Sequence, residues 1–177
     1  MSRVPSEPSE PVDPSDPEDL ARRYRAAMAR LPGGVAVIAG RAAGRDIVSV
    51  VTSLVSVSLD PPMALVVVHG ASRLGETLEV GSRWAATVMG AGSAPAVTWL
   101  AEPGRPDLGQ LRGVEHDRGA TSGAALLSGG AAWIECVTEQ VHEAGDHLVV
   151  VGRVTEAGPG GADGALVHRL GRVRDLP

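Results

Sequence analysis

The chain has 177 residues, of which 44% are apolar, 21% charged and 2% aromatic, and its formal net charge is −5. This length fits one domain with a hydrophobic core, and the apolar content excludes a wholly disordered chain. The sequence has no apolar run of the roughly 20 residues that span a membrane and no secretory signal, and its single cysteine, Cys136, excludes an internal disulfide. We therefore expect a cytoplasmic protein that does not contact membranes.

The net charge is concentrated at the N-terminus. Residues 1–19 contain six acidic residues and one arginine, whereas the rest of the chain contains 15 acidic residues and 15 arginines. Prolines recur at every third position from Pro5 to Pro17, which is typical of extended polyproline II. We predict a solvated tail over residues 1–19, with a docking arm as the alternative, and one domain over residues 20–177. The neutral charge of that domain argues against nucleic acid as a partner.

The first predicted elements are one helix and two strands. Apolar residues at helical spacing predict a helix over Pro17–Leu31. The period then changes, and Val35–Ala39 is predicted as a strand that ends in a glycine-rich turn over Gly40–Arg45. Ile47–Leu59 alternates in the manner of a strand and ends at Asp60-Pro61-Pro62, because proline cannot donate to a β-ladder.

The middle of the chain mixes strands with short helices. Met63–His69 and Trp84–Met89 are apolar enough to be buried strands. Short helices are predicted over Ser72–Val80 and Ala94–Glu102, and the second leads into a loop over Pro103–Gly123.

The last third of the chain is predicted to be β-structure. Two long strands, Ala131–His142 and His147–Glu156, flank a four-residue turn, and Leu166–Arg174 is predicted as one shorter strand. Six or seven strands joined by short turns favour an antiparallel barrel over a βαβ fold. No Rossmann glycine pattern opens a helix after a strand.

Several catalytic chemistries lack the residues that they need. The sequence has no lysine for a Schiff base and no GxSxG elbow for a serine hydrolase. A metal site is not predicted, because the five histidines show neither HxH nor HxxxH spacing. Cys136 alternates within a predicted strand, so a buried structural thiol is favoured over a nucleophile.

Two features remain that suit ligand binding. The predicted strand Val48–Ser58 contains many hydroxyl groups, which could face a ligand rich in carbonyls, ring nitrogens and phosphate oxygens or could equally decorate a solvent face. The tripeptide Gly145-Asp146-His147 stands at a predicted hairpin turn and is by itself an ordinary turn sequence.

The order of these segments resembles the flavin reductase family of FMN-binding split barrels, the small reductase components of two-component flavin monooxygenases. The resemblance runs from about Leu20 to Arg174 and is carried by PGGVAVI at 32–38, SLVSVSLDPP at 53–62, AWIEC at 132–136, and AGDH at 144–147 with VGRV behind it. It implies a mainly β, antiparallel Greek-key split β-barrel that dimerises and binds FMN or FAD near the subunit interface. The implied activity is hydride transfer from NADH or NADPH to flavin, which then leaves for a partner monooxygenase.

The same resemblance assigns residues to the cofactors. Gly34 and Val35 would lie near the isoalloxazine ring, Thr52, Ser53 and Ser56 would bind the ring edge or ribityl chain, and Ser72 and Arg73 would meet the phosphate. Asp146 and His147 would contact the nicotinamide nucleotide, with His147 as the candidate catalytic residue, acting mainly by binding and orientation. His168 and Arg172 would line the same side.

The chain also departs from the family pattern. Val50-Val51-Thr52-Ser53 stands where the family often has T-A-N-S, and Thr87 stands where it often has asparagine. Losing two or three hydrogen bonds of about 1 kcal/mol each would weaken flavin binding by about one to two orders of magnitude. That suits a flavin exchanged as a substrate. The alternatives are a split-barrel flavoenzyme that acts directly on a small organic substrate, and a non-catalytic flavin-binding dimer.

Overall fold

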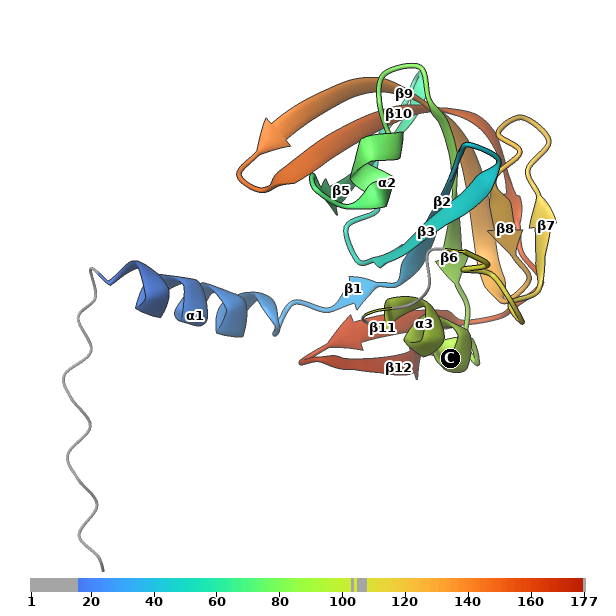
Figure 1. Cartoon of the computed structure of the whole chain (residues 1–177). Coiled ribbons are helices and arrows are strands. Elements are labelled where there is room, and N and C mark those ends of the chain that lie inside the picture. Colours follow the sequence, from blue (N-terminus) through green and yellow to red (C-terminus); the bar gives the residue numbers. More distant parts are fainter. Residues whose placement is uncertain (1–15, 103, 105–107, 177) are drawn as a thin grey trace, which may run out of the picture.

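The computed structural model describes residues 16–102, 104 and 108–176 (Figure 1). The largest unit of the fold is one antiparallel sheet of seven strands in the order β3-β2-β6-β9-β10-β5-β4, accompanied by a sheet of β1, β11 and β12 and a pair of β7 and β8. The elements are α1 (Pro17–Met28), β1 (Gly33–Gly34), β2 (Ala36–Ala42), β3 (Arg45–Val51), β4 (Val55–Leu59), β5 (Pro62–His69), α2 (Arg73–Thr77), β6 (Arg83–Met89), α3 (Ala94–Ala101), β7 (His116–Arg118), β8 (Ala125–Leu127), β9 (Gly130–Ala144), β10 (His147–Pro159), β11 (Ala165–Arg169) and β12 (Arg172–Leu176).

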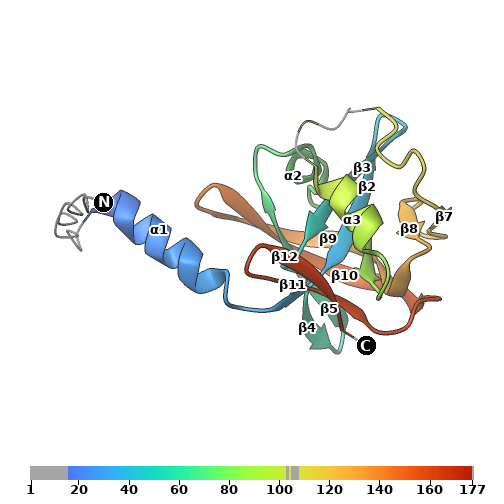
Figure 2. The same cartoon turned by 90° about the horizontal axis from the view of Figure 1, so that it is seen from below.

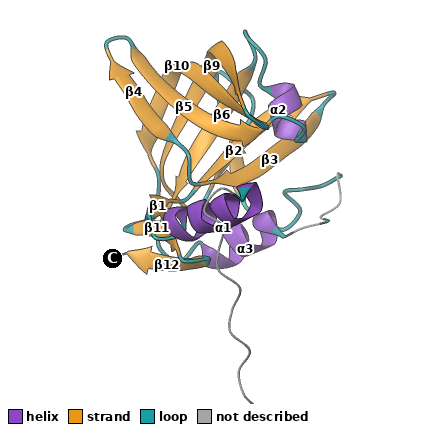
Figure 3. Ribbon diagram, turned by 90° about the vertical axis from the view of Figure 1, so that its left-hand side faces the viewer, coloured by secondary structure: helices purple, strands orange, loops and turns teal. Residues whose placement is uncertain are grey.

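The two edge strands of the large sheet follow each other in the sequence. β3 ends at Val51 on one edge, and β4 begins at Val55 on the other. Residues 52–54 therefore cross from edge to edge, and the sheet curls into a barrel whose edge strands are not paired with each other (Figure 3). This architecture confirms the predicted split barrel. The prediction of one continuous strand over Ile47–Leu59 is wrong, because its alternation continues through the crossing segment.

The C-terminal segment also differs from the prediction. Instead of one strand over Leu166–Arg174, β11 and β12 form a hairpin whose two turn residues, Leu170 and Gly171, have positive φ angles of 52° and 71°. β11 pairs on its other side with β1, so that Gly33 lies opposite His168. Within the predicted loop over Pro103–Gly123, the structure places β7, which pairs with β8. Strands this short leave too little periodicity to be recognised.

The core lies on both faces of the central strands. Along β2, Ile38 packs into one buried cluster, whereas Val37 and Ala39 pack into the other. α2 and its C-cap residue cover the first cluster with Leu74 and Leu78, and α3 covers the second with side chains that include Val97 and Leu100. Burial on both faces explains why the central strands have continuous apolar runs.

α1 projects away from the barrel in both Figure 1 and Figure 2. Its C-terminal end is attached through the Leu170 backbone N–H, which donates to the Ala29 carbonyl at 2.7 Å, and through Arg169, which donates to the Arg30 carbonyl at 3.2 Å. The predicted tail falls mainly on residues 1–15, which lie outside the described residues. Among the described helices, none is long and apolar enough to span a membrane.

Candidate functional site

The residues that the sequence singles out gather around one end of β5. Ser53, in the segment between β3 and β4, lies against Val67, with its Oγ donating to the Val67 carbonyl at 2.8 Å and accepting from the Val67 N–H at 3.2 Å. Two residues further along β5 is His69, which lies opposite His147, the first residue of β10. The crossing segment and the predicted Asp146–His147 turn are thereby brought to the same strand end.

Asp146 forms the centre of a polar cluster with two histidines. Its Oδ1 lies 2.6 Å from His147 Nδ1, and its Oδ2 lies 3.9 Å from His69 Nε2. The two imidazole rings are 5.3 Å apart and meet edge to face. The hydrogen bond from His147, together with the charge of that ring, lowers the pKa of Asp146, so this carboxylate stays ionised near neutral pH.

His69 is the member of this cluster that the sequence analysis missed. Its Nδ1 accepts a hydrogen bond from the Ala71 N–H at 3.1 Å, which leaves Nε2 as the ring nitrogen that carries a proton toward Asp146. A histidine at the end of a predicted strand was the only signal in the sequence. The pairing of β5 with β10, which joins residues 78 positions apart, cannot be read from either segment alone.

α2 is seated directly on this end of β5. The Ser72 hydroxyl accepts from the Gly75 N–H at 3.0 Å, as a helix cap, and donates to the His69 carbonyl at 2.6 Å. Gly75 approaches β5 so closely that a Cβ there would lie 2.5 Å from the His69 carbonyl oxygen. Arg73, the first residue of α2, is exposed beside this junction.

The other side of the site is formed by β1 and the C-terminal hairpin. A Cβ at Gly33 would lie 3.0 Å from the Thr52 Cβ, so the crossing segment touches β1. Gly34 is exposed and lies opposite Val167, one residue from His168. Arg172 begins β12 and is exposed at the same hairpin. The structure thus brings Gly34, Thr52 and His168 to one region of the surface.

Two predicted hydroxyls are available to a ligand. Thr52 and Ser56 are exposed, and their side chains make no hydrogen bond to the part of the chain that the structure describes. A hydroxyl can both donate and accept, and the exposed backbone of Gly34 leaves room for a flat ring to approach. This donor set fits the ring edge and ribityl chain of a flavin, and Arg73 fits its phosphate.

Three predicted contact residues do not reach this surface. Val35 is buried and its N–H donates to the Leu166 carbonyl. Val50 is half-buried and packs against the core. Thr87 is buried, and its hydroxyl accepts from the Leu127 N–H at 3.1 Å.

Cys136 and Glu135 are buried side by side on β9, away from the candidate site. Cys136 is buried, and burial together with the nearby Glu135 charge raises the pKa of its thiol to about 12, which confirms the predicted structural thiol. Glu135 is buried beside it and accepts hydrogen bonds from Thr121 and Ser122. Across residues 16–102, 104 and 108–176, no three His, Cys, Asp or Glu side chains gather as a metal site would require.

Comparison with known proteins gives a consistent result. Residues 28–177 match the family described as Flavin reductase like domain. The NADH-dependent FMN reductase AsuE2 of Streptomyces nodosus subsp. asukaensis is 35% identical over 157 residues, covering 86% of this chain and 83% of that protein. The NADH:FAD oxidoreductase SgcE6 of Streptomyces globisporus C-1027, solved with NAD and FAD fragments, is similar with a TM-score of 0.82 and 28% identity, over 94% of this chain and 98% of that one. BorF, the flavin reductase component of a bacterial two-component tryptophan halogenase, is similar with a TM-score of 0.80 and 33% identity. The match covers 89% of this chain and 98% of BorF.

Proposed function

The chain belongs to the flavin reductase like domain family, and from this we propose that it is an NAD(P)H:flavin oxidoreductase that supplies reduced FMN or FAD to a partner flavin-dependent monooxygenase. The observation that carries the proposal is the meeting of Thr52, Ser72 and the Asp146–His147 pair around one end of β5. Relatives with the same activity in their names support it, as does a similar structure that holds NAD and FAD fragments.

The protein's part in this reaction is binding and orientation. When bound, the flavin accepts a hydride from the reduced nicotinamide ring, and this chemistry belongs to the two cofactors. Thr52 and Ser56 would hold the flavin edge and ribityl chain, while Ser72 and Arg73 would face its phosphate. His147, held by Asp146 at 2.6 Å, would orient the nicotinamide nucleotide over the flavin.

The polar cluster suits that task because its parts fix one another. Asp146 remains ionised and accepts from His147, while its backbone carbonyl accepts from the Gly70 N–H at 2.9 Å. His69 lies directly opposite His147 on the neighbouring strand and restricts where the His147 ring can turn. An oriented imidazole loses little conformational entropy when a nucleotide binds, which favours affinity.

We further propose that the protein is a homodimer and that it works in the cytoplasm. The β4 strand is an edge of the sheet and exposes Val55, Val57 and Leu59, the last with 85% of its surface accessible. α1 and the turn that follows it expose a second set of apolar side chains, Leu20, Tyr24, Met28 and Leu31. Exposed apolar rows of this size on an edge strand and a projecting helix are typical of surfaces covered by another subunit.

The test is steady-state oxidation of NADH and NADPH by the purified protein, with and without added FMN, FAD or riboflavin. We expect strong stimulation by free flavin, and the preferred pair identifies both nucleotides. An absence of turnover with every pair in a folded sample would contradict the proposed function.

The partner reaction is tested by transfer of the reduced flavin. Reduced flavin made by the protein should support substrate oxygenation by a flavin-dependent monooxygenase added in the same vessel, also when a dialysis membrane separates the two proteins. Product formation across the membrane would show that the flavin is released and exchanged. Oxidation of a small organic substrate without any second protein would instead favour a self-contained flavoenzyme.

A further inference from the structure

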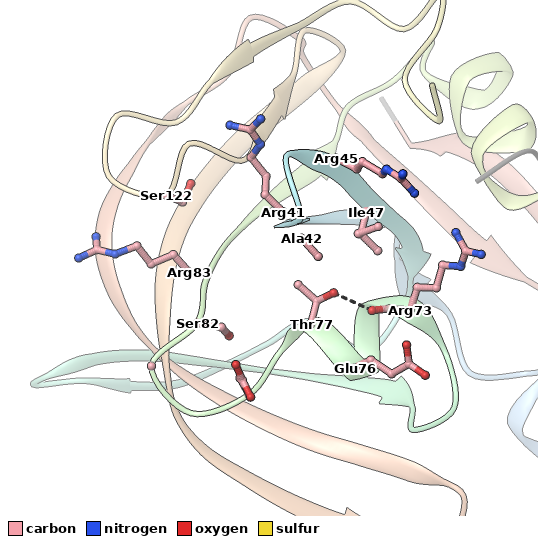
Figure 4. Close-up of a pocket in the computed structure, with 12 residues that line it drawn as sticks. Arg41, Ala42, Arg45, Ile47, Arg73, Glu76, Thr77, Ser82, Arg83 and Ser122 are labelled. Carbon is pink, nitrogen blue, oxygen red and sulfur yellow. Dashed lines mark hydrogen bonds between the residues drawn. The ribbon is translucent and has the colours of Figure 1, made fainter. Parts of the chain in front are cut away.

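A cavity of about 840 Å³ lies beside α2 and is lined in part by Arg73 (Figure 4). It is open to solvent and is bordered by the β2–β3 hairpin, by α2 and by the segment that leads into β6. This volume falls within the range of small-molecule sites, about 300–1,000 Å³. The cavity is large enough for a nucleotide, and none of the residues assigned above except Arg73 lines it.

The cavity is lined by four arginines from four different elements, namely Arg41, Arg45, Arg73 and Arg83, and by two glutamates, Glu76 and Glu79. Cations therefore outnumber carboxylates in a domain whose total charge is zero. Clustered guanidinium groups from separate elements are the arrangement that proteins use to bind phosphate oxygens.

The arginines are not all neutralised by the protein itself. Arg41 donates to the Gly44 carbonyl at 3.3 Å, and Arg83 donates to the Thr121 carbonyl at 2.9 Å. The bond of Arg83 to a neutral carbonyl leaves its positive charge in place, whereas Arg41 also lies 3.8 Å from the Asp46 carboxylate. The Arg45 side chain makes no hydrogen bond or ion pair within the described ranges. In Figure 4, Arg45 and Arg73 extend toward the same side of the cavity.

The rest of the lining suits the remainder of a nucleotide. Ile47 and Ala42 provide an apolar surface, and Thr77, the last residue of α2, also lines the cavity, with its hydroxyl donating to the Arg73 carbonyl at 2.7 Å. A purine ring packs favourably on such an apolar surface, while the charged rim meets phosphate.

We propose that this cavity binds the adenylate half of FAD, so that the protein discriminates FAD from FMN. The inference rests on the proposed function. It follows from Arg73, which both adjoins Ser72 at the predicted flavin phosphate and lines the cavity. A second phosphate joined to the first would enter the cavity beside Arg45, with the adenosine against Ile47. FMN ends at its first phosphate and gains nothing from Arg45.

The experiment is isothermal titration of the full-length protein with FMN, FAD and AMP, for the wild type, for Arg45→Gln and for the matched control Arg153→Gln. Arg153 is exposed on β10 and pairs with Glu139, outside the cavity. We expect Arg45→Gln to weaken FAD binding about tenfold and to weaken AMP binding, with FMN affinity changed less than twofold. Arg153→Gln should leave all three unchanged, and thermal unfolding should show both variants folded.

Other outcomes would show whether the cavity binds FAD, the nicotinamide nucleotide or neither. Equal weakening of FAD and FMN, or no change in either, would overturn the proposal. A raised KM for NADH or NADPH with unchanged FAD affinity would assign the cavity to the nicotinamide nucleotide and also overturn it. If no flavin stimulates NAD(P)H oxidation but FAD binding still depends on Arg45, the proposed function fails while the adenylate site stands.

Discussion

At the scale of single residues, the most informative group is Asp146, which lies between two imidazoles. It accepts from His147 at 2.6 Å and lies 3.9 Å from His69. The carboxylate fixes the orientation of one ring, and the second ring limits its movement. The cluster thereby gains the fixed geometry that the proposed recognition of a flexible nucleotide would require.

Replacement of His147 by alanine should impair the use of the nicotinamide nucleotide. We expect His147→Ala to raise the KM for that nucleotide about tenfold, because one oriented polar contact is lost, and to change flavin affinity less than twofold. Steady-state kinetics and flavin titration measure the two effects. His142→Ala is the matched control, because His142 is exposed on β9 and bonds only to Gln140 among the described residues. Loss of flavin binding alone would contradict the role given to His147.

Glu135 gives a prediction about stability. Burial alone would raise the pKa of Glu135, but hydrogen bonds from Ser122 and Thr121 outweigh it and lower the pKa. The ionised form therefore stabilises the fold. We expect Glu135→Gln to lower the free energy of unfolding by about 1.5–3 kcal/mol at pH 7, as for hydrogen bonds to charged groups.

The stabilisation by Glu135 should decrease as the pH falls. The contribution of Glu135 should be complete above its unfolded pKa of about 4.3 and should disappear as the pH falls through the lower folded value. Chemical denaturation at pH 7 and below pH 4 measures the difference between wild type and Glu135→Gln. Glu139→Gln, on the same strand but exposed and paired with Arg153, should change stability by less than about 1 kcal/mol. If Glu135→Gln remained less stable than the wild type by the same amount below pH 4, the charge of Glu135 would not be the cause of the difference.

At the scale of elements, the sequence predicted most segments correctly as helix or strand. It missed two places where a predicted single strand is in fact two strands, namely β3 and β4, and β11 and β12. Val51 and Val55 continue one alternation, yet they belong to opposite edges of the sheet. Nothing local marks the crossing, because it is specified by the hydrogen bonds of Ser53 to Val67, which depend on the folded sheet. The hairpin at Leu170 was missed for a different reason, because leucine rarely adopts a positive φ.

The motifs in the sequence indicated which segments form the candidate site, but they did not indicate which side chains of those segments face the surface. Asp146 and Ser72 lie where a ligand could reach them, whereas the predicted contacts Val35 and Thr87 are buried. Which face of a strand points inward depends on the curl of the whole barrel, and that cannot be read from a nine-residue window.

Ser53 should matter to the fold more than its neighbour Ser56. Its hydroxyl pairs with both the N–H and the carbonyl of Val67, so Ser53→Ala leaves two backbone groups without that partner and should cost about 1–3 kcal/mol of unfolding free energy. Ser56→Ala, at an exposed hydroxyl with no bond to the described residues, should change stability by less than about 0.5 kcal/mol. Denaturant titration of both variants measures this contrast. Equal stabilities would contradict the role of Ser53 in fixing the crossing segment.

At the scale of the whole molecule, the exposed apolar rows on β4 and around α1 support the proposed homodimer and allow it to be tested. Leu59→Glu would place a charge on the proposed interface, at the end of β4, and should raise the dimer dissociation constant at least tenfold. Sedimentation velocity over a range of concentrations measures the change. Leu108→Glu, at a leucine 64% exposed in a loop, is the control and should leave the dimer intact. A wild type that stays monomeric at all concentrations would rule out the homodimer.

The pairing of β1 with β11 has a consequence for how the protein is made. Gly33 and Gly34 are synthesised long before their partners on β11, His168 and Val167. The pairing of β1 with β11 therefore cannot form until β11 has been made, because contacts so distant in sequence wait for the later strand. If this edge contributes to the proposed flavin site, a ribosome-stalled chain that ends at residue 164 should already contain the β2–β3 hairpin and bind no flavin, whereas a chain stalled with residues 165–177 outside the ribosome should bind it.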